Sequence, residues 1–190
     1  LLRLKLPQRL QDEVDVQSAG TLGIQGMAAA EYSVRVVREF GGDIGGHRSQ
    51  GLSRKLVAAS DLILAMAGEH VEHLRKHYPA YRENVFLLKS FAQTEPLEDP
   101  EIEDPIGSSL AIYRECGRLI ADEIDRVLPA IVHLVKERRR ETPRAPRNVF
   151  CCRARTGSAI SCFRLRSRPR SKRNFHNAKY SFWRATMPRK

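Results

Sequence analysis

The chain has 190 residues, of which 42% are hydrophobic, enough to build one ordinary core with an appendage. Its formal net charge of +11 is unevenly spread, because residues 1–137 carry 16 Lys and Arg against 21 Asp and Glu, whereas residues 138–190 carry 17 against 1. No apolar run reaches the roughly 18 residues that span a membrane, and no secretory signal pattern opens the chain, so we expect a cytoplasmic protein with no membrane partner.

The first 60 residues predict a helix, a strand and two further helices. The leucines of residues 1–11 are typical of the last turns of a helix disturbed by Pro7, and residues 14–17 alternate as in a strand that ends in a loop of small residues. Residues 28–40 predict a helix with Val34, Val37 and Phe40 facing inward, stopped by a left-handed glycine. Ser53 is expected to cap a short helix that runs to Ala59.

Residues 61–137 continue the alternation of strand and helix. The continuous apolar run at 61–66 predicts a strand buried on both faces, and residues 85–88 predict another. Helices are expected at 69–77 and from Leu110 onward, the last one with a kink at Pro129. This order favours an α/β fold with a doubly wound parallel sheet.

One acid stands out in the loop before the last helix. Asp104 precedes Pro105, which fixes its own φ and disfavours helical backbone at Asp104, while Gly107 gives the turn freedom. Asp104 is therefore expected at a rigid loop tip that presents its carboxyl. The plainer interpretation is a turn residue before proline.

The C-terminal segment differs from the rest of the chain. Residues 140–190 are dense in Arg, Ser and Lys and show no apolar period, so we predict a folded domain over residues 1–139 and a disordered basic tail over residues 140–190. Such a tail could contact nucleic acid nonspecifically through phosphate attraction. A tail without a role is the simpler hypothesis.

The stretches Tyr81-Arg-Glu-Asn-Val-Phe-Leu-Leu-Lys89 and Asp104-Pro-Ile-Gly-Ser-Ser-Leu-Ala-Ile-Tyr113 resemble the bacterial branch of the low molecular weight protein tyrosine phosphatases, which includes the protein arginine phosphatases. Four further motifs, in this order and spacing, resemble the family as a whole. They are Ser18-Ala-Gly-Thr21, His47-Arg-Ser-Gln-Gly-Leu-Ser53, Asp61-Leu-Ile-Leu-Ala-Met66 and Glu103-Asp-Pro-Ile-Gly107.

The resemblance implies a four-stranded parallel sheet and a monomeric, cofactor-free and metal-free hydrolase that dephosphorylates proteins through a cysteinyl-phosphate. By position, Asp104 matches the general acid, and Ser18 and His47 match residues that support the phosphate loop. Gln50 stands where several relatives have a basic residue. In the family, the nucleophile Cys and the phosphate-binding Arg lie in a Cys–x5–Arg loop that joins the central first strand to the first helix. This loop is expected ahead of Leu1. We therefore expect the chain as given to lack that strand and to be inactive.

Ile106 stands where tyrosine-directed relatives often have an aromatic residue, so phosphotyrosine and phosphoarginine both remain open as substrates.

Other constellations are weaker. Cys162 and Arg168 have the spacing of a phosphate loop, but the five residues between them include no glycine. His70, His73 and His77 share a helix face without an evident fourth ligand, and we assign no metal. An arsenate reductase-like enzyme is an alternative, although no Cys precedes residue 116 to serve its chemistry. The remaining alternative is a non-catalytic remnant with a polyanion-binding tail.

Overall fold

The computed structural model describes residues 1–141, 147–153 and 164–165, with side chains up to residue 138. Helices, strands and one 3-10 turn (η1) alternate along these residues. In chain order they are α1 (Leu2–Lys5), α2 (Gln8–Gln11), β1 (Val14–Gly20), α3 (Glu31–Glu39), α4 (Arg54–Ala58), β2 (Ile63–Ala65), α5 (Gly68–His77), η1 (Pro79–Asn84), β3 (Val85–Leu87), α6 (Leu110–Glu141), β4 (Arg147–Arg153) and β5 (Arg164–Leu165).

The described strands form one sheet in the order β3-β2-β4-β1-β5. Strands β3, β2, β4 and β1 are parallel, and β5 is antiparallel to β1. All three residues of β2 are buried, as expected for a parallel strand covered on both faces. The predicted α/β class with a doubly wound parallel sheet is confirmed.

The central position of the sheet is filled by a segment that the sequence did not indicate. Strand β4 pairs with β1 from Val14↔Arg147 to Gly20↔Arg153, and with β2 from Ile63↔Phe150 to Ala65↔Cys152. These residues belong to the predicted disordered tail, so that prediction is wrong for 147–153 and 164–165. For 142–146, 154–163 and 166–190 it lies outside the described residues, as does the predicted nucleic-acid contact.

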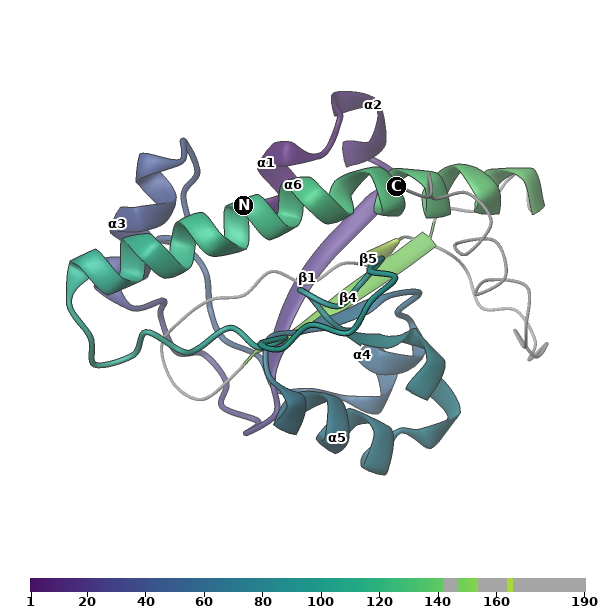
Figure 1. Ribbon diagram of the computed structural model, residues 1–190, viewed down its shortest axis with the longest axis horizontal. Coiled ribbons are helices and arrows are strands. Elements are labelled where there is room, and N and C mark those ends of the chain that lie inside the picture. The colour runs from purple at the N-terminus through teal and green to yellow at the C-terminus, as the bar shows by residue number, and fades with distance from the viewer. Residues whose placement is uncertain (142–146, 154–163, 166–190) are drawn as a thin grey trace.

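The helices cover the two faces of the sheet. Figure 1 shows α6 lying across one face together with α1, α2 and α3, whereas α4 and α5 lie on the other face. Ser53 caps α4 as predicted, because its hydroxyl accepts a hydrogen bond from the Leu56 amide at 3.2 Å. None of the described helices is long and apolar enough to cross a membrane.

Helix α6 is the longest element, and it continues through Pro129. It is tied to the rest of the domain at both ends. Arg114 makes a bidentate ion pair with Glu39 of α3, and Arg138 pairs with Asp61 just before β2. The predicted domain boundary at residue 139 therefore falls within the last turn of a helix that runs to Glu141.

Some predicted inward positions are wrong. On α3 the buried residues are Ser33 and Val36, whereas Phe40 is 37% exposed. On α6, the apolar stripe that begins at Leu110 in the sequence also predicts Ile112 and Leu119 to face inward, but both are exposed. The buried positions of α6 follow a helical period instead, and include Tyr113, Gly117, Ala121, Ile124, Val127, Ile131 and Val135. Each of these two helices carries more apolar residues than one face can bury, so some of its apolar residues remain exposed.

Candidate active site

Asp104 lies in the long connection between β3 and α6, and a local turn fixes its carboxyl. The Asp104 Oδ1 atom accepts a hydrogen bond from the Ile106 amide at 3.1 Å. The turn closes with the Ser108 amide donating to the Pro105 carbonyl, and Gly107 takes a positive φ of 78° that favours glycine. The turn that the Asp-Pro pair predicts is therefore present in the structure.

Two contacts hold this loop against the carboxyl end of β2. The Ile102 amide donates to the carbonyl of Met66, the residue after β2, at 2.8 Å. Glu101 accepts a hydrogen bond through Oε1 from the Gly68 amide, at the start of α5, at 2.9 Å. Ile102, which is held in this way, lies two residues before Asp104. Asp104 is therefore near the carboxyl ends of the strands, where ligands of α/β proteins commonly bind.

Cys116 is the only cysteine in residues 1–139, and it lies beside Asp104. Its thiol contacts the Glu103 carbonyl at 3.7 Å. Burial, and then the nearby Asp104 carboxylate, raise the pKa of the Cys116 thiol to about 11. Because a thiolate is the nucleophilic form, Cys116 is poorly suited to attack phosphorus at neutral pH.

His70 is a neighbour of Asp104 that the sequence did not single out for this role. Its side chain is almost fully buried in the first turn of α5, and its ring nitrogens have no hydrogen-bond partner among the described residues. Burial lowers the pKa of His70, while the carboxylates of Glu69, Glu101 and Asp104 act in the opposite direction. No group of three or more possible metal ligands occurs in the described part of the chain.

Ser18 and His47 line a second part of the site. They share a pocket of about 860 Å³ with the basic side chains of Arg3 and Arg48 and with Gln50. Gln50 donates through Nε2 to the Ser18 carbonyl at 2.7 Å, and the main-chain carbonyl of Gln50 accepts a hydrogen bond from the Gly20 amide. Gln50 thus supports the end of β1 through its side-chain amide and its main-chain carbonyl.

The register of the sheet relates these two groups of residues. Cys152 pairs with Ala19 of β1 on one side and with Ala65 of β2 on the other. The Ser18 pocket lies at the end of β1, and the Asp104 loop is attached at the end of β2. The structure therefore places them on either side of the carboxyl end of β4. Asp104 does not line the Ser18 pocket.

Several known proteins resemble this chain in sequence and in fold. A family profile described as low molecular weight phosphotyrosine protein phosphatase matches residues 1–140. The probable low molecular weight protein-tyrosine-phosphatase EpsP of Ralstonia nicotianae is 34% identical over 131 residues, which cover 69% of this chain and 83% of that protein. A protein-arginine-phosphatase of Geobacillus stearothermophilus is 29% identical over 114 residues, or 60% of this chain and 74% of the relative.

Solved structures show the same similarity. A mutant of the YwlE arginine phosphatase with a phosphorylated active-site serine has a TM-score of 0.59 and 27% identity, and the match covers 73% of this chain and 86% of that one.

Proposed function

This chain belongs to the low molecular weight phosphotyrosine protein phosphatase family, a family of hydrolases, and we propose that its fold serves to remove phosphate from tyrosine or arginine residues of proteins. The observation that supports this most is the placement of Asp104. Its carboxyl is bound by the turn at Ile106, in a loop that is attached through Ile102 to the end of β2, next to the central position of the parallel sheet. Ser18 and His47 lie on the other side of that position.

In the proposed reaction a thiolate attacks phosphorus and the bond to the leaving oxygen or nitrogen breaks. Asp104 in its protonated form donates the proton that the leaving group requires. The resulting carboxylate then takes a proton from water as that water attacks the cysteinyl-phosphate, which releases inorganic phosphate and restores the acid. Ser18 and His47 are proposed to support the loop that binds the phosphate. The phosphorylated active-site serine of the YwlE mutant is in keeping with such a covalent intermediate.

The proposed reaction needs a nucleophile that residues 1–139 do not supply. Cys116 is unsuitable because its pKa is raised to about 11, and residues 1–139 contain no Cys–x5–Arg loop. Such a loop supplies both the thiolate and the amides that stabilise the phosphoryl group. We therefore propose that the 190 residues by themselves turn over phosphomonoesters very slowly, and that a supplied Cys–x5–Arg loop makes Asp104 effective.

The test compares the chain with a chimera that ends at Glu141, so that β4 does not occupy the central position of the sheet, and that carries ahead of Leu1 the first strand and phosphate loop of the Geobacillus arginine phosphatase. In the form that turns over substrate, Asp104→Asn should lower kcat by about 10² to 10⁴ on a phosphomonoester with a poor leaving group, because general acid assistance is lost. The kcat for a substrate with a very good leaving group should fall less. Glu103→Gln, which changes the adjacent carboxylate, is the matched control and should leave kcat near the parent value.

Two results would contradict the proposal. Rapid turnover by the unmodified chain would mean that its nucleophile lies elsewhere, and full activity of Asp104→Asn would mean that Asp104 is not the acid. Phosphotyrosine and phosphoarginine peptides measured side by side would then identify the substrate. Ile106, which is 42% exposed directly after the Asp-Pro pair, offers no aromatic ring for a tyrosyl substrate to pack on.

A further inference from the structure

The connection that carries Asp104 is long and irregular. Between Leu87, the end of β3, and Leu110, the start of α6, it contains neither a strand nor a helix. A loop of this length is costly to hold in one conformation unless side chains bind its backbone. The local turn at Ile106 fixes the Asp104 carboxyl relative to its own neighbours, but it does not fix that turn relative to the sheet.

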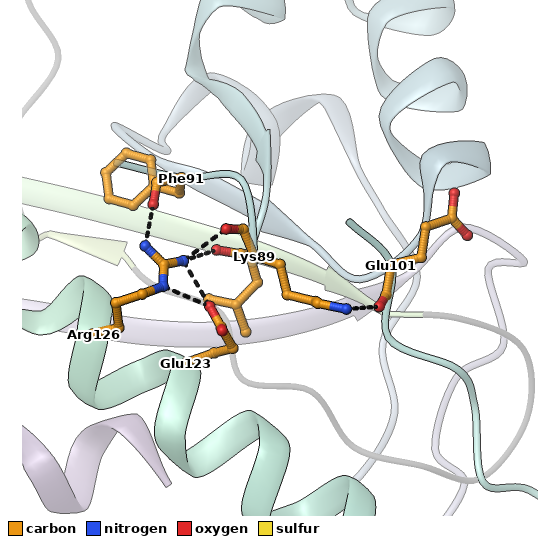
Figure 2. A network of polar contacts seen from close by, with 6 residues as sticks. Lys89, Phe91, Glu101, Glu123 and Arg126 are labelled. Atoms are coloured by element: carbon orange, nitrogen blue, oxygen red, sulfur yellow. Dashed lines mark hydrogen bonds and ion pairs between the residues drawn. The ribbon is translucent and has the colours of Figure 1, made fainter. Parts of the chain in front are cut away.

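Arg126 of α6 binds the first part of this connection. Its guanidinium donates to the carbonyls of Leu88 at 3.0 Å, Lys89 at 2.8 Å and Phe91 at 2.9 Å. Glu123, one turn earlier on α6, accepts from the same guanidinium at 2.6 Å and orients it. Figure 2 shows this planar group between the helix and the turn. Because the donors of arginine form a fixed fork, one side chain holds three main-chain carbonyls of the connection.

Lys89 extends the attachment to the segment just before Asp104. Its ammonium donates to the Glu101 carbonyl at 3.0 Å and pairs with Asp99 at 2.8 Å. The Lys89 side chain is only 14% exposed, whereas Asp99 is 82% exposed, so the ion pair with Asp99 is screened by solvent on the carboxylate side. Figure 2 shows Lys89 reaching from the Arg126-bound turn to Glu101.

Glu101 then connects this network to the sheet and to α5. Its carboxylate accepts from the Gly68 amide, and a Cβ at position 68 would lie 2.7 Å from the Glu101 Oε1 atom, so an added side chain would displace this carboxylate. The Ile102 amide bonds to Met66. A continuous set of contacts therefore runs from α6 through Arg126, Lys89 and Glu101 to the residues that precede Asp104.

We propose that Arg126 and Lys89 are positioning residues that hold the Asp104 carboxyl in place for proton transfer, an inference that rests on the function proposed above. Arg126 fixes the turn at Leu88–Phe91, and the fixed turn aims Lys89 at Glu101. Loss of either side chain should free the Asp104 turn without altering the groups that bind phosphate. The expected signature is a lower kcat with little change in KM.

Hydrogen exchange of the full chain tests the positioning. Lys89→Met and Arg126→Lys should speed exchange of the Ile102 and Ile106 amides by about tenfold to a hundredfold, as expected for loss of a hydrogen bond to a charged group. Amides of Leu64 in β2 and Ile124 in α6 should keep their rates. Lys55→Met and Arg118→Lys change exposed residues of α4 and α6, and are the matched controls. Unchanged rates at Ile102 and Ile106 would overturn the proposal, as would equal acceleration at Leu64 and Ile124.

Kinetics separates this proposal from the proposed function. In the form of the protein that Asp104→Asn impairs, Lys89→Met should lower kcat for a poor leaving group by about tenfold and affect a good leaving group less, because only acid assistance is weakened. Faster exchange with unchanged kcat would overturn the catalytic part of the inference. If Asp104→Asn itself has no effect on turnover, the proposed function fails, and the exchange result then reports on the loop only.

Discussion

His70 is a titratable group that the fold keeps away from water. Its exposed fraction is 1%, and Glu69 lies 3.6 Å from its Nε2 atom, too far for a hydrogen bond of normal strength. Burial is the main cause of its lowered pKa, and His73 on the same helix acts in the same direction. The neutral imidazole is therefore the form that the folded state prefers.

This preference predicts a pH-dependent stability. The unfolded chain takes up a proton at His70 near pH ~6.5, before the folded chain does, so stability is fully present above that pH and is lost as the pH falls towards the lowered folded pKa. Replacing His70 with Leu should reduce the loss in melting temperature between pH 7 and pH 5. The pKa of His73 is also lowered, so His73→Gln is measured in parallel to separate its share. An identical pH slope in His70→Leu and the parent would contradict the prediction.

At the scale of elements, α3 and α6 approach closely at Gly117. A Cβ built on Gly117 would lie 2.6 Å from Val36 Cγ1 and 3.4 Å from a ring atom of Phe40. Val36 is buried and β-branched, so it has little freedom to move aside. The Arg114–Glu39 ion pair joins the same two helices. The crossing of α3 over α6 therefore depends on glycine inside a helix, where propensity alone would favour alanine.

Gly117→Ala should consequently destabilise the domain. The gain in helix propensity is about 1 kcal/mol, whereas overpacking a buried contact costs about 1 to 3 kcal/mol, so a net loss in the free energy of unfolding is expected. Denaturant unfolding measures it. Gly46→Ala is the control, because a Cβ at that position meets nothing within 4 Å.

A double mutant makes this test specific. Val36→Ala combined with Gly117→Ala should lose less stability than the sum of the two single changes, because the smaller side chain accommodates the added methyl group. Strict additivity would show that the close approach between α3 and α6 does not govern the effect.

At the scale of the whole molecule, local patterns predicted the elements formed by neighbouring residues and missed those formed by distant ones. Apolar runs indicated β2 and β3, and Ser53 indicated the start of α4. Asp104 followed from the Asp-Pro pair. The roles of Arg126 and Lys89 did not follow from any local pattern. The Leu88 carbonyl that accepts a hydrogen bond from Arg126 lies 38 residues away along the chain. No local period reveals such a contact.

Strand β4 shows the same limit most clearly. Residues 147–153 carry an arginine at each end and stand in a strongly basic region, so their composition favoured disorder. In the structure they complete the hydrogen bonds of two other strands, β1 and β2, that precede them by more than 80 residues. Pairing of this kind depends on the unsatisfied edges of the partners more than on the propensity of the inserted segment.

Removing β4 should therefore lower the stability of the whole domain, contrary to the hypothesis of a tail without a role. Without it the order β3-β2-β4-β1-β5 is interrupted, and no described strand pairing connects β2 to β1. The buried strand Ile63–Ala65 would expose an unpaired edge, which favours association between chains.

A chain that ends at Glu141 should accordingly melt at lower temperature, with a broader transition and a tendency to associate, than a chain that ends at Leu165 and keeps both β4 and β5. In the full chain, Val149→Pro should act in the same direction, because proline cannot donate a hydrogen bond from the middle of a central strand. Ala154→Pro, placed after the end of β4, is the matched control. Calorimetry and light scattering measure both effects. Equal melting of the 1–141 and 1–165 chains would show that β1 and β2 hold together without β4, and that residues 1–141 are the folded unit.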